Sequence, residues 1–168
     1  MPGWIQRFFH SRARESSRFL MCLVIDACSA NIIAENSCEP SSIIIAWVRM
    51  KGRVVSGGKL QEELGRTKLR SLISTWSAAG KFLVVDQSEL EKHIADLKNC
   101  TLRSNDVHVV AVARTANAGV VVTGDDLLIA DLKDPTVSKQ RRRVIKLRHG
   151  YSPSKRIIKG VLREAGCG

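Results

Sequence analysis

Aromatic residues, paired cysteines and long apolar runs are all scarce in this 168-residue chain. Aromatic side chains make up 5% of the residues, so readout of a nucleic acid by stacking bases on aromatic rings has little support. The five cysteines are odd in number and lack Cys-x-x-Cys spacing, which argues against a zinc ribbon or a disulfide framework and predicts reduced, cytosolic thiols. No apolar run reaches the ~20 residues of a membrane span. We therefore expect a cytoplasmic protein without stable membrane association.

Acidic residues are also in the minority. The chain has 27 Lys and Arg against 16 Asp and Glu, a formal net charge of +11. Such an excess indicates a polyanionic partner, and nucleic acid is the commonest one. The chain is 44% hydrophobic, which at this length suffices for one domain with a substantial core. The sequence thus predicts a basic, single-domain protein with a polyanionic partner, nucleic acid first and an acidic lipid surface as the alternative.

Short apolar runs alternate with segments of helical spacing. This alternation predicts an α/β fold with three layers, α/β/α, around a mostly parallel central sheet. A change of apolar face near Gly65 predicts a kinked or two-part helix. The expected strands span 20–25, 53–56, 81–86 and 120–123, and the expected helices span 27–34, 43–50, 60–76, 88–98, 106–117 and 125–132.

The composition divides the chain into three parts. Residues 1–20 read as an N-terminal extension, residues 21–134 as the folded domain, and residues 135–168 as a basic C-terminal tail with a possible edge strand at 144–147 and a short helix after Pro153. The tail supplies candidate contacts to phosphates. These are Arg141, Arg142, Arg143, Arg148 and Lys155.

Acidic side chains follow two of the expected strands. Asp26 ends the first strand and Asp125 follows the fourth, and the carboxyl ends of parallel strands meet at one edge of a sheet. Asp106 begins a helix on which Val110 and Ala113 share its face, so its side chain is expected to point inward, whereas His108 is expected to point outward. The sequence therefore predicts three carboxylates near one edge.

Glu63 is a candidate for a fourth acid. Helical spacing places it beside the stripe of Leu60 and Leu64, whereas Glu62 lies on the opposite face. Each acid also has a structural alternative: Asp106 and Asp125 could cap helices, Asp26 could only end a strand, and Glu63 could be a solvated surface residue.

Carboxylates gathered at the rim of an apolar core repel one another unless a proton or a cation compensates. A hard divalent ion, Mg²⁺ or Mn²⁺, is the usual compensation. Such an ion activates water and neutralises charge on a phosphodiester. A cation held by acids in a basic protein is a combination suited to cutting an anionic chain.

Four segments together resemble the PIN-domain family of metal-dependent nucleases. They lie in the family's order and approximate spacing, between about residues 21 and 133, and the last two are the most specific. The segments are LVID at 23–26, LQEEL at 60–64, NDVHVVAVA at 105–113 and VVTGDDLL at 121–128.

The resemblance implies a set of site residues. Asp26, Glu63, Asp106 and Asp125 would be catalytic and would hold one or two Mg²⁺ or Mn²⁺ ions, with Thr123 supporting them through its hydroxyl. Asp126 is an alternative to Asp125. The chain departs from the family after the first aspartate, where PIN domains often have Thr-Asn or Thr-Ser and this chain has Ala27-Cys28; Asn31, one turn later, is a candidate substitute.

The resemblance also implies an activity, endonucleolytic hydrolysis of RNA. Two other classes stay open: a PIN-like RNA-binding module that does not cut, and a structure-specific DNA nuclease. Many small PIN proteins are toxins of toxin-antitoxin pairs, so the partners to expect are RNA, an antitoxin protein and a second copy of the chain.

Overall fold

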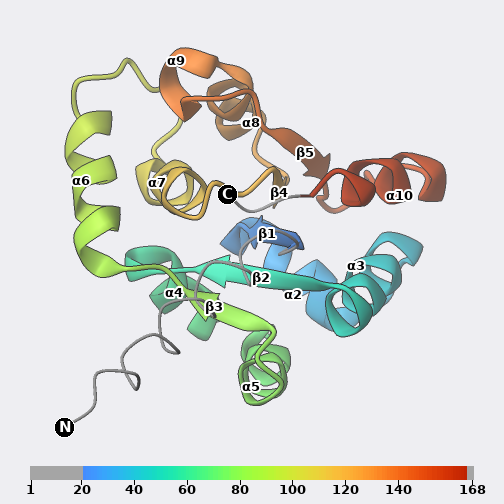
Figure 1. Ribbon diagram of the computed structural model, residues 1–168. Coiled ribbons are helices and arrows are strands. Elements are labelled where there is room, and N and C mark those ends of the chain that lie inside the picture. Colours follow the sequence, from blue (N-terminus) through green and yellow to red (C-terminus); the bar gives the residue numbers. More distant parts are fainter. Residues whose placement is uncertain (1–20, 166–168) are drawn as a thin grey trace, which may run out of the picture.

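The computed structural model describes residues 21–165, which form an α/β fold around a parallel sheet (Figure 1). Within these residues the sheet has five strands, in the order β3-β2-β1-β4-β5, and every neighbouring pair is parallel. The predicted three-layer α/β/α class is confirmed. The strands are β1 (Met21–Ile25), β2 (Gly52–Ser56), β3 (Phe82–Val84), β4 (Val120–Thr123) and β5 (Arg143–Lys146).

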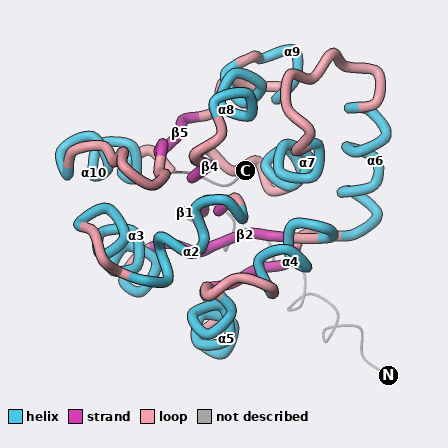
Figure 2. The backbone as a smooth tube through the Cα atoms, turned by 180° about the vertical axis from the view of Figure 1, so that it is seen from behind, coloured by secondary structure: helices cyan, strands magenta, loops and turns pink. Residues whose placement is uncertain are grey.

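Helices cover both faces of this sheet. They are α2 (Ala27–Glu35), α3 (Glu39–Met50), α4 (Gly58–Gly65), α5 (Arg70–Ala78), α6 (Gln87–Leu97), α7 (Val107–Thr115), α8 (Asp126–Lys133), α9 (Pro135–Ser138) and α10 (Lys155–Arg163). Helices α7, α8 and α9 lie on one side of the sheet and α3 and α5 on the other (Figure 1). Seen from behind, α6 lies outside α7, against which it packs (Figure 2).

The two central strands are buried along almost their whole length. In β1, Leu23 and Ile25 are fully buried, as are Val120 and Val122 in β4. Parallel strands covered on both faces need such continuous apolar runs, because both sides of each strand pack against helices. The burial of these apolar residues fixes the position of each strand in the sheet, so the residues that follow the strands lie at a defined edge.

The order of the strands creates a crevice between β1 and β4. The chain runs from β1 outward to β2 and β3, and then crosses the sheet to β4, on the other side of β1. Connections on the two sides of this point lie on opposite faces, so the carboxyl ends of β1 and β4 are left open between them. Asp26 follows β1 and Asp125 lies just beyond β4.

Most of the predicted elements are present, with altered bounds. The two-part helix is confirmed, since α4 ends at Gly65 and α5 begins at Arg70. The helix expected at 43–50 begins earlier in the structure: α3 starts at Glu39 and includes Pro40 in its first turn, where the missing N–H of proline costs nothing. The predicted extension at 1–20, and residue 20 of the first expected strand, lie outside the described residues.

The basic C-terminal region is part of the folded domain. Its predicted edge strand is confirmed as β5, which pairs with β4, and its predicted helix is α10, which packs on α3 and β5. Ile158 and Leu162 of α10 are buried in the same core as the sheet. Residues of 135–165 thus pack into the same core as residues 21–134.

Two composition-based expectations can be compared with the described residues. Cys28, Cys38 and Cys100 are free, but Cys22 is disulfide-bonded, so the expectation of reduced thiols is wrong for Cys22. No helix among residues 21–165 is long and apolar enough to span a membrane.

Candidate functional site

Asp26 is the most firmly held of the four predicted acids. It is 4% exposed, its backbone N–H donates to the carbonyl of Val122 at 2.9 Å, and its Oδ2 accepts a hydrogen bond from the hydroxyl of Thr123 at 2.6 Å. This hydrogen bond is the contact that the predicted supporting role of Thr123 requires. The structural alternative, an aspartate that merely ends a strand, does not explain why a fully buried hydroxyl on the neighbouring strand is aimed at this carboxylate.

Cys28 occupies the position at which the sequence departs from the PIN pattern. Its thiol donates to Asp26 Oδ2 at 2.9 Å, and its sulfur accepts the backbone N–H of Gly124 at 3.3 Å. Although the residue as a whole is exposed, burial of the sulfur against these groups, followed by the hydrogen bond to Asp26, raises the pKa of the thiol. Cys28 is therefore a neutral donor to Asp26, a role that the sequence analysis missed.

The turn between Thr123 and Asp125 requires glycine. A Cβ atom on Gly124 would lie 2.7 Å from the Cβ of Arg148 and 2.8 Å from the carbonyl oxygen of Leu147. This close approach seats the turn against the segment after β5. The Thr-Gly-Asp sequence therefore serves to bring the end of β4 and the end of β5 together.

Glu63 is held by His108. The imidazole Nε2 lies 2.8 Å from Glu63 Oε2, and Lys59 lies 3.5 Å from the other carboxylate oxygen. The prediction that His108 points outward is wrong: it is 7% exposed, because α7 is enclosed by neighbouring elements on nearly all sides. A semi-buried Glu63 is confirmed, with 29% of its side chain exposed, and the alternative of a freely solvated glutamate is not what the structure shows.

Asp106 differs from the other acids in what surrounds its carboxylate. It stands at the N-terminus of α7, but its side chain makes no capping bond, so the capping alternative does not apply. Burial, then the nearby charge of Asp26, raises the pKa of Asp106 above its ordinary value; Asp125 and Glu63 act in the same direction, and His108 opposes them. The charges of three other acids therefore raise the pKa of a carboxylate that has no hydrogen-bond donor among the described residues.

Asp125 and Asp126 have separate roles. Asp125 caps α8, since its Oδ1 accepts the backbone N–H groups of Leu127 at 2.7 Å and Leu128 at 3.3 Å. Asp126 forms ion pairs with Lys146 and Arg148. Of the two, it is the charge of Asp125 that raises the pKa of Asp106, as expected from its place at the strand edge. Asp125 is also a helix cap, which was its structural alternative.

Asn31 is engaged elsewhere. Its side-chain oxygen accepts the backbone N–H of Lys68 at 2.9 Å, which ties α2 to the segment between α4 and α5. The structure records no contact between this amide and the four acids. The hydroxyl of Thr123 and the thiol of Cys28 fill the place for which Asn31 was a candidate.

The five predicted phosphate contacts are not equivalent. Arg142 is 3% exposed and donates to the carbonyls of Ala118 and Ser138, so its assignment to RNA binding is wrong. Burial, then the charge of Arg114, lowers its pKa to about 10. The other four side chains, those of Arg141, Arg143, Arg148 and Lys155, are exposed.

Among the exposed cations, position decides which could assist the acidic edge. Arg148 follows the end of β5 and pairs with Asp126, next to Asp125. Lys146, which the sequence analysis missed, pairs with the same acid and lies opposite Thr123 in the strand register. Arg143 starts β5 and pairs with Glu164, so it lies at the opposite edge of the sheet.

The donor set suits a hard divalent cation. All four acids offer carboxylate oxygens, the ligands that Mg²⁺ and Mn²⁺ prefer, and the pKa of Asp106 is raised by burial and then by the charge of Asp26, with His108 opposing the shift. Within residues 21–165 no three Asp, Glu, His or Cys side chains are close enough to enclose a metal ion by themselves. Mg²⁺ commonly uses only one or two carboxylates and keeps several waters. The carboxylates of Asp26 and Asp106 are thus of the type that such an ion would use.

A scan against protein-family models, a search of curated proteins and a search of solved structures found no match to this chain.

Proposed function

We propose that this protein is a Mg²⁺- or Mn²⁺-dependent endoribonuclease that hydrolyses phosphodiester bonds of RNA. One observation carries the proposal. Burial and the charges of Asp26, Asp125 and Glu63 raise the pKa of Asp106 at the open carboxyl edge of the sheet. Acids concentrated at one partly buried point repel one another unless a cation binds there, and a raised pKa of this origin is typical of functional sites.

The residues divide the work between holding and positioning. Asp26 and Asp106 would be the ligands of the ion, and Thr123 fixes the orientation of Asp26 through its hydroxyl. His108 holds Glu63 at the rim of the same cluster. When bound, the ion would lower the pKa of a water and neutralise charge on the scissile phosphate. With its imidazole paired to Glu63, His108 acts as a positioning residue.

RNA would be drawn to this edge by the cations beside it. Lys146 and Arg148 lie next to the acids, whereas exposed Arg141 precedes β5, towards the opposite edge, and adds only to the general attraction of phosphates. Contacts of lysine and arginine to phosphates are independent of sequence. They weaken as the salt concentration rises, because the release of counterions on binding then becomes less favourable. We therefore expect salt-sensitive binding with little base preference. In-line attack by water would leave a 5′-phosphate, as the resemblance to PIN domains implies.

The test is cleavage of a labelled single-stranded RNA, with single-stranded DNA alongside. Wild-type protein is assayed in Mg²⁺, in Mn²⁺ and in chelator, and is compared with Asp106→Asn and with Glu62→Gln. Glu62 is a matched control because it is exposed, neighbours Glu63 and has no recorded polar contact. Metal-dependent RNA cutting that Asp106→Asn abolishes and Glu62→Gln leaves intact would support the proposal.

Each other outcome favours a different function. RNA binding without cutting in any metal would favour a non-catalytic RNA-binding module. Preferential cutting of DNA would favour a structure-specific DNA nuclease. A small protein that co-purifies and blocks RNA cleavage would support the toxin of a toxin-antitoxin pair, and fractionation of cells would test the expected cytoplasmic location.

A further inference from the structure

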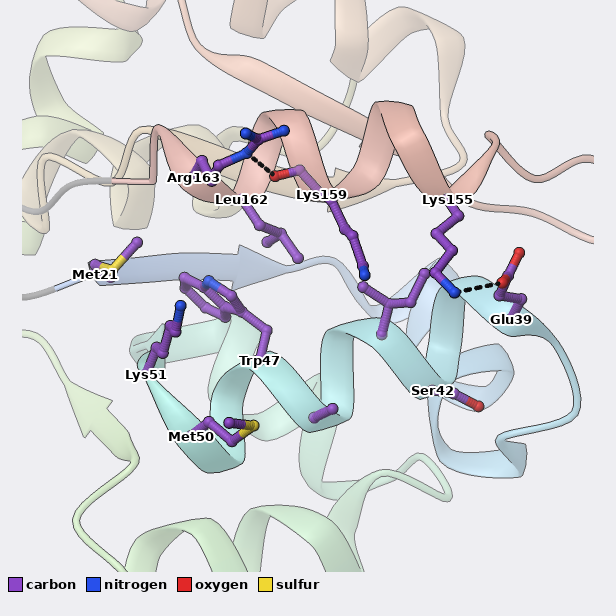
Figure 3. Close-up of a pocket in the computed structure, with 12 residues that line it drawn as sticks. Met21, Glu39, Ser42, Trp47, Met50, Lys51, Lys155, Lys159, Leu162 and Arg163 are labelled. Atoms are coloured by element: carbon purple, nitrogen blue, oxygen red, sulfur yellow. Dashed lines mark hydrogen bonds and ion pairs between the residues drawn. The ribbon is translucent and has the colours of Figure 1, made fainter.

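A groove of about 830 Å³ lies between α3 and α10, and none of the four acids of the candidate site lines it (Figure 3). Its floor is apolar: Trp47 and Met50 from α3 and Leu162 from α10 face it. Met50 is 74% exposed, an unusual state for a large apolar side chain beside other apolar groups. The groove thus leaves an apolar surface open that the fold of residues 21–165 does not cover.

Trp47 packs directly on the start of β2. Gly52, the first residue of β2, lies directly under the indole, and a Cβ atom there would be 1.9 Å from Trp47 Cζ3. The ring therefore packs closely against the backbone of Gly52. A large aromatic side chain held in place is the kind of residue that contributes most to protein interfaces.

The rim of the groove is basic. Lys51, Lys155, Lys159 and Arg163 line it, against a single acid, Glu39. Lys155 is 3.6 Å from Glu39, whereas no ion pair is recorded for the other three cations among the described residues. In Figure 3, Lys159 extends from α10 down towards α3, across the middle of the groove. The surface therefore offers apolar contacts flanked by unneutralised positive charge.

We propose that this groove binds an acidic amphipathic helix of a partner protein. Such a helix would place its apolar side chains on Trp47, Met50 and Leu162 and its carboxylates against Lys51, Lys159 and Arg163. The groove runs along α3, whose 12 residues span about 18 Å at the helical rise per residue, so a partner helix of three to four turns fits its length. Charge complementarity would speed association and disfavour basic partners.

Charge also selects against other occupants. Residues 1–20 contain four Arg and one Glu, so this segment would add positive charge to a basic rim. A second copy bound about a two-fold axis would place the same basic rim against itself. RNA would match the charge, but its phosphates gain nothing from a floor of tryptophan, methionine and leucine, which an apolar helix face does.

The probe is a fluorescein-labelled helical peptide of about 15 residues, slightly longer than the groove, with leucines at i, i+4, i+7 and i+11 and glutamates at the flanking positions. Fluorescence anisotropy gives its Kd for the full-length protein. A second peptide carries lysines in place of the glutamates. Neither measurement uses catalytic activity, so failure here is separable from failure of the proposed nuclease function.

Two variants of α10 make a matched pair. Lys159→Glu reverses a charge inside the groove, and Arg156→Glu makes the same change on an exposed residue of the same helix outside it. Because Lys159 has no recorded side-chain partner, its replacement leaves the fold intact. We expect Lys159→Glu to weaken binding of the acidic peptide about 5- to 20-fold and Arg156→Glu less than about 2-fold, as for charge pairs at a partly exposed interface.

Met50→Asp tests the apolar floor directly. Compared with the wild-type protein, this variant should bind the acidic peptide about 10-fold more weakly, because an apolar contact is lost and a repulsive charge is added. Several results would overturn the proposal. These are no binding of the acidic peptide, equal affinity for the lysine peptide, equal effects of the two α10 variants, binding of labelled RNA that Lys159→Glu abolishes, or self-association of the protein that Lys159→Glu abolishes.

Discussion

The contact between Thr123 and Asp26 gives a sharp test of how the site is built. Thr123 is fully buried at the end of β4, and its hydroxyl donates to Asp26 Oδ2 at 2.6 Å. The hydroxyl oxygen of Thr123 also accepts the backbone N–H of Asp125 at 3.1 Å. Thr123→Val keeps the branched shape but removes both hydrogen bonds. Thr123→Ser keeps the hydroxyl and removes only a methyl group, so it is the control.

The expected loss of stability follows from these two bonds. A hydrogen bond to an ionised carboxylate contributes about 1.5–3 kcal/mol and a neutral one about 1 kcal/mol. The thiol of Cys28 also reaches Asp26, at 2.9 Å, but thiols are weak donors and replace the hydroxyl only in part. We therefore expect Thr123→Val to lower the free energy of unfolding by about 2–3 kcal/mol, and Thr123→Ser by about 1 kcal/mol for the lost methyl.

Thermal denaturation followed by circular dichroism measures this difference. For a domain of this size, 2–3 kcal/mol corresponds to a fall in Tm of about 5–10 °C. Under the proposed function, the valine variant should also lose about 10- to 100-fold in metal-dependent cleavage, because Asp26 loses the partner that orients it. If Thr123→Val matches wild type in both Tm and cleavage while remaining folded, the hydroxyl does not position Asp26 and the reasoning is refuted.

Three further predictions follow from single side chains. Because the pKa of Asp106 is raised in the folded state, its ionised form destabilises the fold at neutral pH and not below the pKa of an unfolded aspartate, 3.8. Asp106→Asn should therefore raise the free energy of unfolding at pH 7, and denaturant melts should show this gain vanishing at acid pH. Arg142→Ala should lower the free energy of unfolding by about 2–4 kcal/mol in the same melts, because buried carbonyls lose a charged donor. Arg141→Ala should change the free energy of unfolding by less than about 0.5 kcal/mol and weaken RNA binding instead. Equal effects of the two variants on the free energy of unfolding would contradict these roles. Gly52→Ala should force Trp47 out of its place and shift the tryptophan emission to longer wavelength, and an unchanged spectrum would contradict the packing.

The α/β class and the position of the acids were predictable because each depends on local pattern. Apolar runs of four to six residues mark buried parallel strands, and an acid after such a run must emerge at the carboxyl edge. Asp26 and Asp125 follow this rule directly. Glu63 was predictable from its flank position beside Leu60 and Leu64, which are both fully buried.

His108 shows where helical periodicity stops being informative. The prediction that it points outward assumed that α7 has one solvent face. In the structure, residues His108 to Arg114 are all buried, because α7 is packed among α4, α6, α9 and β1. On a helix enclosed on all sides, spacing cannot separate inner from outer positions, and a polar residue there needs a partner that lies 45 residues away in the sequence.

The basic C-terminal region was misread for a related reason. Its local charge favoured a solvated tail, but the acids that balance it come from distant elements: Asp126 pairs with Lys146 and Arg148, and Glu39 pairs with Lys155. Arg142 is satisfied by backbone carbonyls, which leave no signal in the sequence. Pairings of this range depend on the assembled fold, so composition alone could not separate structural cations from those available to RNA.

The central claim is that the acidic edge holds a divalent cation through Asp106, and binding of Mn²⁺ measured by electron paramagnetic resonance tests it without any substrate. Free Mn²⁺ is titrated with wild-type protein, Asp106→Asn and Glu62→Gln at pH 7. The account predicts a site in wild type that Glu62→Gln preserves and that Asp106→Asn weakens by about tenfold or more, the effect expected when a ligand is lost. Absence of a Mn²⁺ site in the wild-type protein, or a site that Asp106→Asn leaves unchanged, would contradict it.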